Sequence, residues 1–306
     1  MAAPQVGLVG VGRWGRHILR DLVTLGCDVA AVAASDESRE RAAVGGAAAI
    51  HWSVEALAAD TIDGVVVATP VGTHAVVLEA ILPLGVPVFV EKPLTNDPVT
   101  AARLADLGSG RVFVMDKWRY HPGILELARI ARSGELGGVV GLHTRRVAWG
   151  NTHDGDVDDI WILAPHDLSI AAEILGELPT PRAAVGHAVG GNAQLVGLLG
   201  DAPWLTVDVG GTSLERSRRV ELVLSDGIAW LGDAAADHVG VARNDMLGTA
   251  DWERRPISDE MPLLAELRAF VEHLRGGPPP KSSVEEGVAT VAAIAELRAM
   301  AGLPVG

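Results

Sequence analysis

The sequence holds almost no cysteine, few aromatic residues, and fewer basic than acidic side chains. Its single cysteine, Cys27, excludes a disulfide within the chain and is typical of a protein in a reducing compartment. With 25 lysines and arginines against 39 acidic residues, the formal charge of −14 argues against nucleic acid or an anionic membrane as a partner. The first residues include neither a basic nor an apolar leader segment, so we expect a cytoplasmic protein.

Long apolar runs are missing as well. The longest uncharged stretch, residues 183–200, contains His187, Asn192 and Gln194 and therefore predicts no membrane span. The chain has 306 residues, of which 48% are hydrophobic and 21% charged, a balance typical of globular proteins. This length predicts two domains, each with a core of its own.

Glycines are abundant, and three of them form the most informative motif of the chain. Gly10-x-Gly12-x-x-Gly15 follows a predicted strand, Gln5–Val9, and precedes a predicted helix at 16–25 and a second strand at 28–34. In this context Gly10 permits a tight turn, Gly12 lets the backbone approach a pyrophosphate, and Gly15 lets the helix pack closely. The motif therefore predicts a dinucleotide-binding βαβ unit.

The two halves of the chain have different patterns. Up to about residue 118, short apolar runs at 64–69, 87–90 and 111–115 alternate with helical segments, which predicts a doubly wound parallel sheet of the Rossmann type. Beyond it, strands at 183–189, 205–209, 220–224 and 228–231 follow one another, which predicts an open, mixed and largely antiparallel sheet in an α/β domain. We expect a cofactor domain at 1–118 and a substrate-binding and oligomerisation domain at 119–306.

Further motifs follow the strands of the first half. Thr69-Pro70 precedes His74, and Glu91-Lys92-Pro93 follows the next strand. With the glycine motif, their order and spacing resemble the glucose–fructose oxidoreductase, inositol dehydrogenase and MocA family. The resemblance implies an NAD(P)-dependent oxidoreductase acting on the CH–OH groups of sugars, cyclitols or their derivatives. The cofactor contacts expected from the motifs and the resemblance are Gly10, Gly12, Arg13, Trp14, Gly15, Ser35, Arg39, Thr69, Pro70, His74, Glu91 and Lys92.

Lys92 and His166 are the candidate catalytic residues. Lys92 lies just beyond a buried strand, and Pro93 restricts its backbone, so its ammonium can stabilise a developing alkoxide. The alternative for Lys92 is a solvated surface lysine. The resemblance places a histidine near His166 that faces substrate as a general acid or base, whereas the alternative is a core histidine bonded to a neighbour.

One position departs from the family pattern. Many members carry an aspartate four residues before the histidine, where this chain has Ile162. Either Lys92 and His166 suffice, or a nearby carboxylate substitutes, or the activity has changed. The candidate substitutes are Asp158, Asp159 and Asp167.

The segment from Asp156 to Asp167 also resembles the branch of the family that acts on C3 of nucleotide-linked sugars. The substrate contacts that we expect are Lys92, Tyr120, Asp158, His166 and Asp167, although Tyr120 fits a packing role at the domain junction equally well. Residues 153–156 are rich in aspartate, as metal-binding loops are, but the glutamate of an EF-hand is missing. We therefore favour a solvated loop and expect no metal.

The end of the second strand bears on the choice of cofactor. Ala34 stands where NAD enzymes carry a carboxylate, while Ser35 and Arg39 would meet a 2′-phosphate, which favours NADP over NAD. A shift of one or two residues would instead place Asp36 on the ribose.

Two other functions stay open: reduction of a non-sugar carbonyl or imine in secondary metabolism, and a non-catalytic cofactor-binding sensor, which Ile162 would favour. Apolar strands such as 220–224 predict that a second copy of the chain covers one sheet face, in a homodimer or homotetramer.

Overall fold

The computed structural model describes residues 3–150, 157–244 and 252–305. The chain divides into two compact units. Unit 1 comprises the residues up to Lys117 together with Leu263–Val291, and unit 2 comprises Trp118–Pro262 together with the residues from Ala292 onward. The division after Lys117 lies one residue before the expected boundary, but residues 263–291, expected in the second domain, pack with the first.

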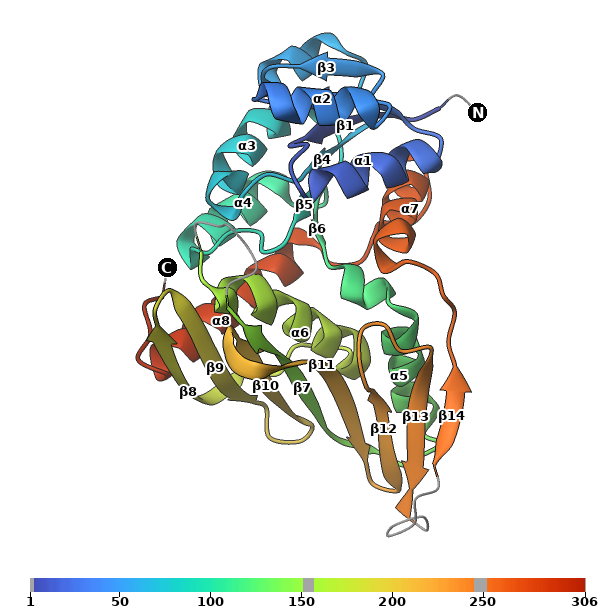
Figure 1. The fold of residues 1–306 in the computed structure, drawn as a ribbon, viewed down its shortest axis with the longest axis vertical. Helices are drawn as coiled ribbons and strands as arrows, with labels where there is room; N and C mark the ends of the chain where they lie inside the picture. Colours follow the sequence, from blue (N-terminus) through green and yellow to red (C-terminus); the bar gives the residue numbers. More distant parts are fainter. Residues whose placement is uncertain (1–2, 151–156, 245–251, 306) are drawn as a thin grey trace. The chain divides into compact units, whose positions relative to one another are not determined.

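Unit 1 contains a parallel sheet in the order β3-β2-β1-β4-β5-β6 (Figure 1). Its strands are nearly all apolar because both faces of the sheet are covered by helices. Their bounds are β1 Gln5–Val9, β2 Asp28–Val32, β3 Ala49–His51, β4 Gly64–Val67, β5 Val88–Glu91 and β6 Val112–Met115. The strand order reverses at β1 and β4, and ligands of such sheets bind at this switch point, beyond the carboxyl ends of the strands.

The helices of unit 1 connect the strands or return from the end of the chain. Their bounds are α1 Gly15–Thr24, α2 Asp36–Val44, α3 His74–Ile81, α4 Pro98–Gly108 and α7 Pro262–Leu274, with short 3-10 helices η1 Val54–Ala59, η2 Val71–Thr73 and η3 Leu82–Leu84. Helix α7 belongs to this core because Phe270 stacks on Phe89 of β5, with ring centroids 5.1 Å apart. Leu19 of α1 lies in the same apolar cluster.

Unit 2 contains a mixed sheet in the order β14-β13-β12-β11-β7-β10-β9-β8. Strands β7 and β10 pair in parallel, whereas the other neighbours pair antiparallel. The bounds are β7 Val139–Trp149, β8 Pro181–Val189, β9 Asn192–Leu199, β10 Trp204–Gly210, β11 Thr212–Leu224, β12 Gly227–Leu231, β13 His238–Arg243 and β14 Glu253–Pro256.

The remaining helices are η4 Lys117–Tyr120, α5 Pro122–Ser133, α6 Asp159–Leu175 and α8 Val284–Met300. Alternation along the strands separates the two faces of the sheet in unit 2. Leu142, Leu195 and Leu222 are buried on the face covered by helices, whereas Val196 and Leu198 are exposed on the other. The sequence predicted, from apolar strands such as 220–224, that a second copy of the chain covers one sheet face, but Val220, Leu222 and Leu224 are buried within the chain.

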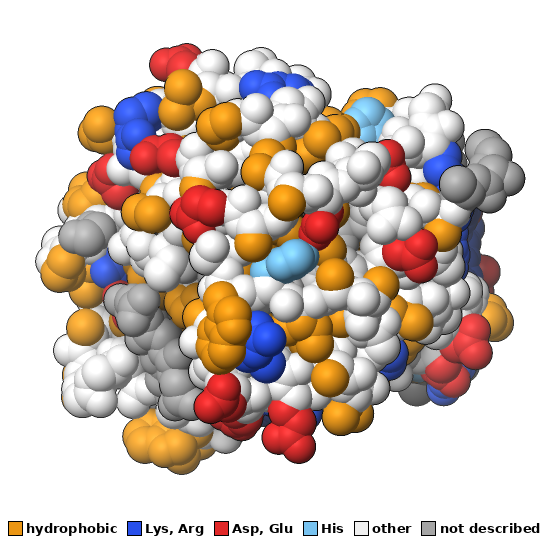
Figure 2. All heavy atoms as spheres, turned by 90° about the horizontal axis from the view of Figure 1, so that it is seen from above, with side chains coloured by type: hydrophobic (Ala, Val, Ile, Leu, Met, Phe, Trp, Pro, Cys, Tyr) orange, Lys and Arg blue, Asp and Glu red, His pale blue; other side chains and the backbone are white. Residues whose placement is uncertain are grey.

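The predicted fold class is confirmed: a Rossmann sheet is followed by a mixed, largely antiparallel sheet. Strand β9 was not predicted, since its stretch was interpreted only as uncharged. The turn before it is formed by Gly190 and Gly191, with φ angles of 59° and 84°, which is the backbone that a two-residue hairpin requires. On the face drawn in Figure 2, basic side chains are dispersed among acidic and apolar ones. No helix in the described ranges is long and apolar enough to cross a membrane.

Candidate active site

The glycine loop after β1 has the shape of a phosphate cradle. Gly10 has a φ of 97°, and a Cβ there would lie 2.7 Å from the carbonyl oxygen of Ala68. A Cβ on Gly15 would lie 2.0 Å from the carbonyl oxygen of Gly10, so this position must also be glycine. A Cβ on Gly12 would meet no atom within 4 Å, which leaves open space in front of the loop.

Helix α1 begins at this loop without a side-chain cap. Its N-cap residue, Trp14, makes no capping hydrogen bond, and the first turn contains no acidic residue. Amides of an uncapped first turn are suited to bind an anion, since they donate hydrogen bonds and carry the positive end of the helix dipole. The backbone nitrogens of Arg16 and His17 donate to the carbonyl oxygens of Gly12 and Trp14, so the open space at Gly12 and the amides before Arg16 are the part that fits a pyrophosphate.

Glu91 connects the glycine loop with the candidate catalytic lysine. Its carboxylate accepts a hydrogen bond from the indole nitrogen of Trp14 and another, 3.2 Å long, from the backbone nitrogen of Lys92. The Lys117 ammonium lies 4.1 Å from the centroid of the Trp14 ring, a cation–π contact. Trp14 therefore links the ends of β1 and β5, in agreement with the packing role at the edge of the site that its sequence position also allowed.

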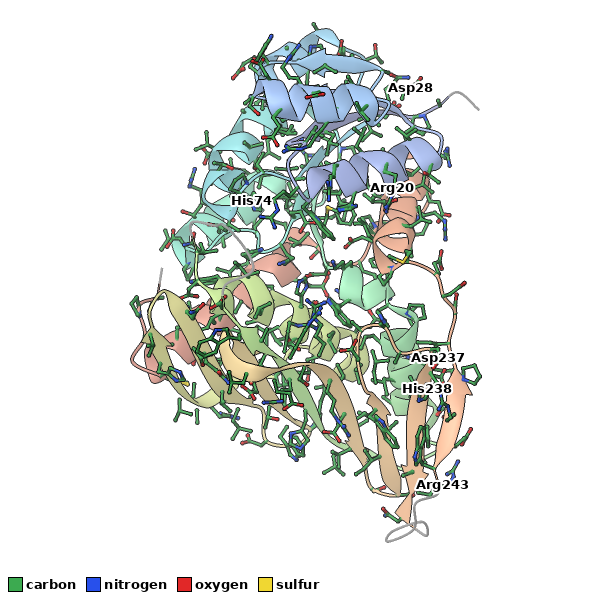
Figure 3. All side chains as sticks on the ribbon, in the orientation of Figure 1. Arg20, Asp28, His74, Asp237, His238 and Arg243 are labelled. Carbon is green, nitrogen blue, oxygen red and sulfur yellow. The ribbon has the colours of Figure 1, made fainter. Side chains whose placement is uncertain are left out.

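His74 connects the ends of β4 and β5. It is fully buried, and its ring nitrogens lie 3.0 Å from the carbonyl oxygen of Pro93 and 2.9 Å from that of Thr69 (Figure 3). Burial lowers the pKa of His74, while the two carbonyl groups oppose that shift. Because its side chain has no exposed surface, His74 acts by holding these two loops, with the Lys92-Pro93 bond in the cis form.

Thr69 and Pro70 lie directly beside the glycine loop. A Cβ on Gly10 would come within 3.0 Å of the Thr69 Cγ2 atom, and the Thr73 hydroxyl lies 2.9 Å from Thr69 Oγ1 and 2.7 Å from the carbonyl oxygen of Pro70. The structure therefore brings the predicted residues after β1, β4 and β5 to one edge of the sheet.

The end of β2 carries the second part of the predicted cofactor site. The Ser35 hydroxyl accepts a hydrogen bond from the Ser38 backbone nitrogen, 3.2 Å away, and so caps α2. The Arg39 guanidinium lies over the Trp52 ring, 3.9 Å from its centroid, and its Nη1 atom is buried without a hydrogen-bond partner among the described residues. Ala34 is exposed and has no carboxylate to offer a ribose. Trp52 is a residue that sequence reasoning missed.

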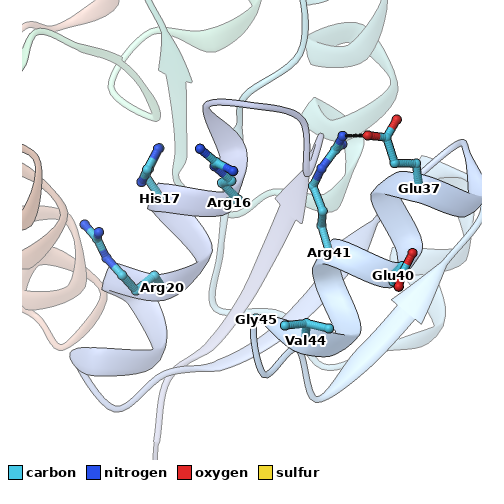
Figure 4. A pocket seen from close by; sticks show the side chains of 8 residues that line it. All are labelled: Arg16, His17, Arg20, Glu37, Glu40, Arg41, Val44 and Gly45. Atoms are coloured by element: carbon cyan, nitrogen blue, oxygen red, sulfur yellow. Dashed lines mark hydrogen bonds and ion pairs between the residues drawn. The ribbon is translucent and has the colours of Figure 1, made fainter.

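A hollow of about 600 Å³ lies between α1 and α2, on the helix-covered side of the sheet rather than at the strand ends (Figure 4). Arg16, His17 and Arg20 project from α1, while Arg41 of α2 pairs with Glu37. Three arginines and His17 line it together with Glu37 and Glu40, and we assign no function to it.

In unit 2, His166 lies in α6 and is partly buried. Pro165 precedes it inside the helix and has no N–H to donate to the carbonyl of Trp161. The His166 ring lies 6.4 Å from the ring of Trp118, centroid to centroid. The resemblance expected a histidine at the start of a helix, whereas His166 lies in the third turn of α6.

Ile162 is buried one turn before His166, and the three carboxylates considered as substitutes all have partners in unit 2. Asp158 caps α6 by accepting from the backbone nitrogens of Ile160 and Trp161, and it forms an ion pair with Arg298 at 2.8 Å. Asp159 accepts a 3.1 Å hydrogen bond from the backbone nitrogen of Ala193, and burial raises its pKa.

Asp167 forms the third pair, with Arg146 of β7. Arg146 Nε donates to Asp167 Oδ2 over 2.7 Å, and both side chains are almost completely buried. Burial raises the pKa of Asp167, while Arg146 opposes that shift. Asp158 and Asp167, expected as substrate contacts, therefore both hold other parts of the protein, and Arg146 was not predicted.

Trp118 links this ion pair with His121. The Arg146 guanidinium lies 4.2 Å from the Trp118 ring centroid, and the His121 ring stacks on Trp118 at 5.0 Å. Tyr120 lies in η4 and is partly buried. Residues 153–156, considered as a metal loop, lie outside the described residues.

Comparison with known proteins decides the family. The model of an oxidoreductase family with an NAD-binding Rossmann fold matches residues 5–111. UDP-N-acetylglucosamine 3-dehydrogenase from Acidithiobacillus ferrooxidans is 31% identical over 223 residues, which cover 71% of this chain and 67% of that protein. The chain belongs to the Gfo/Idh/MocA family. Residues 5–111 of its first unit form the NAD(P)-binding Rossmann fold of that family.

Other family members match over different lengths. Inositol 2-dehydrogenase from Corynebacterium glutamicum (strain R) is 34% identical over 151 residues, or 45% of each chain, so the chain spans about half the length of this relative. A solved structure of the Acidithiobacillus ferrooxidans enzyme is 25% identical and superposes with a TM-score of 0.82 over 98% of both chains. Levoglucosan dehydrogenase shares the fold, with a TM-score of 0.86 at 15% identity.

Proposed function

We propose that this member of the Gfo/Idh/MocA family is an NAD(P)-dependent oxidoreductase that acts on a carbinol or carbonyl carbon of a sugar or nucleotide-sugar derivative. The observation that carries the proposal is the edge of the unit 1 sheet. There the open glycine loop, the Thr69-Pro70 turn and the cis Lys92-Pro93 segment lie together, connected by Glu91 and His74. When bound, the nicotinamide group supplies or accepts the hydride.

The residues of this chain then have separate tasks. Lys92 polarises the oxygen on the reacting carbon of the substrate, and His166 transfers the proton to or from that oxygen. Ile162 offers no carboxylate, and Asp158, Asp159 and Asp167 are engaged elsewhere. We therefore assign the chemistry to Lys92 and His166 without a third acidic group.

The test is the replacement Lys92→Met, with Lys281→Met as the matched control. Lys281 is a partly buried lysine that lies after α7, in the loop before α8. We expect Lys92→Met to lower single-turnover hydride transfer by about 100-fold or more, and to leave cofactor affinity nearly unchanged. Turnover at the rate of the unchanged protein would refute the assignment of Lys92.

We propose that the cofactor is NADP rather than NAD. Ala34 offers no carboxylate to a ribose hydroxyl, and the buried Arg39 Nη1 atom has no partner among the described residues, while Trp52 fixes the guanidinium plane. We expect Arg39→Met to weaken NADPH binding by about 10- to 100-fold and to change NADH binding little, measured by fluorescence titration. Equal losses for both cofactors would contradict this preference.

The proposal includes a homodimer or homotetramer in the cytoplasm. The exposed apolar side chains of β8 and β9, among them Val185, Val196 and Leu198, support a second copy as the cover of this sheet face. A single-chain mass by light scattering at micromolar concentration would contradict it.

A further inference from the structure

Two arginines lie side by side on the helix-covered face of the unit 2 sheet. Arg146 of β7 and Arg218 of β11 are direct partners in the antiparallel ladder. Directly opposed residues of such a ladder point to the same face, so both side chains lie on the side where Leu142 and Leu222 are buried. A neighbouring pair of like charges costs free energy unless each charge is matched.

The charge of Arg146 is matched. Its guanidinium forms the buried ion pair with Asp167 and lies over the ring of Trp118, 4.2 Å from the ring centroid. Asp167 belongs to α6, the helix that covers this part of the sheet, and it directly follows His166. Arg146 therefore ties the helix that carries the candidate proton-transfer group to the sheet.

The charge of Arg218 is not matched in this way. Its side chain is partly buried, and among the described residues it forms no ion pair or hydrogen bond. Burial lowers the pKa of Arg218, and the neighbouring charges of Arg146 and Arg216 act in the same direction, opposed by Asp233 and Asp167. A guanidinium presents donors in a fixed fork that fits a carboxylate or a phosphate group, and it stays charged at neutral pH.

We infer that Arg218 is a specificity-determining residue that binds an anionic group, a carboxylate or a phosphate, carried by the sugar substrate. The inference rests on the proposed function, because it takes the region around His166 as the place where the sugar binds. Two contacts within unit 2 connect Arg218 with that region through its ladder partner Arg146. Arg146 forms an ion pair with Asp167, the residue next to His166. Arg146 and His166 also both lie beside the Trp118 ring. An anion at Arg218 supplies the counter-charge that Asp167 supplies to Arg146.

The opposite sheet face provides a matched control. Arg219 is the next residue along β11, points to the other face, and forms a surface ion pair with Glu221 at 2.9 Å. Arg219→Gln therefore removes the same charge from the same strand without touching the proposed anion site. Arg218→Gln is the test variant, and Arg218→Lys keeps the charge but loses the fork.

The experiment measures binding, not turnover. The protein loaded with NADPH is titrated with glucose, glucuronate and glucose 6-phosphate, and ligand binding is followed by calorimetry. We expect one or both of the anionic sugars to bind about 10- to 100-fold more tightly than glucose, since charge-assisted hydrogen bonds stabilise their complexes. Which of the two binds more tightly distinguishes a carboxylate from a phosphate.

Arg218→Gln removes this advantage, Arg218→Lys keeps part of it, and Arg219→Gln keeps all of it. Equal affinities for the three sugars in the unchanged protein overturn the inference, as does an advantage that survives in Arg218→Gln. If Arg218→Gln does not fold, a full advantage in Arg218→Lys still overturns it, because the fork is lost there. The proposed function fails by a different result, undiminished hydride transfer in Lys92→Met.

Discussion

Glu266 of α7 provides a direct test of the electrostatics inside unit 1. Its side chain is fully buried, and neither carboxyl oxygen has a hydrogen-bond partner among the described residues. Burial raises the pKa of Glu266 well above its ordinary value, and Glu91 and Asp116 add to that shift, while Lys117 opposes it. We therefore predict that the folded protein keeps this carboxyl protonated at pH values at which the unfolded chain has lost the proton.

The consequence for stability follows from the sign of the shift. Above the ordinary pKa of a glutamate the unfolded chain loses this proton while the folded chain keeps it, so raising the pH destabilises the folded state. The stabilisation that this proton gives the folded state is fully present below the ordinary pKa of glutamate. It is lost as the pH rises through the pKa of Glu266 in the folded protein. Within that window the free energy of unfolding falls by about 1.4 kcal/mol per pH unit for this one group.

The perturbation is Glu266→Gln, which keeps the shape of the side chain but does not titrate. Urea unfolding followed by tryptophan fluorescence at about pH 5.5 and about pH 6.5 gives the pH dependence for both proteins. We expect the unchanged protein to lose about 1.4 kcal/mol more than Glu266→Gln over this interval.

Glu272→Gln, on the exposed side of the same helix, is the control and should retain the slope of the unchanged protein. Parallel pH profiles for the unchanged protein and Glu266→Gln would refute a buried neutral carboxyl. A constant offset between parallel profiles reflects only the cost of the buried amide and does not rescue the idea.

Three other perturbations have defined outcomes. Gly15→Ala should abolish NADPH binding in a fluorescence titration, because its Cβ would lie 2.0 Å from the Gly10 carbonyl oxygen; normal affinity would contradict the cradle. Arg146→Met should lower the free energy of unfolding by about 3–5 kcal/mol, since Asp167 would keep a buried, unpaired charge, and a loss below 1 kcal/mol in urea would disprove that pairing. Burial raises the pKa of Cys27 to about 11, so iodoacetamide at about pH 8 should label it far more slowly in the folded protein than in urea, as mass spectrometry would show.

The parts of the fold that the sequence predicts well are those that local chemistry decides. The turn at Gly10 and the helix after Gly15 follow from steric rules that operate within a few residues. The Asp158 cap is equally local, yet it was interpreted as a substrate contact because the resemblance outweighed the capping preference of aspartate.

The parts that were missed depend on register and on distant segments. Arg146 meets Asp167 only because β7 turns that side chain toward α6, and a shift of one residue would send it to the opposite face. The return of α7 to unit 1 depends on Phe270 packing against Phe89, a contact that no local pattern contains. Burial of Glu266 follows from the same packing.

The return of α7 also has a consequence for how the chain is made. When residues up to Lys117 have left the ribosome, β5 is complete, but the aromatic ring that covers Phe89 has not yet been synthesised. Part of the apolar surface of the nascent Rossmann sheet therefore stays uncovered while all of Trp118–Pro262 is translated. Unit 2 is not complete at that point either, because Arg298, which pairs with Asp158 at the start of α6, is translated after α7. Neither unit can therefore finish folding before its share of the residues after Pro262 has been made.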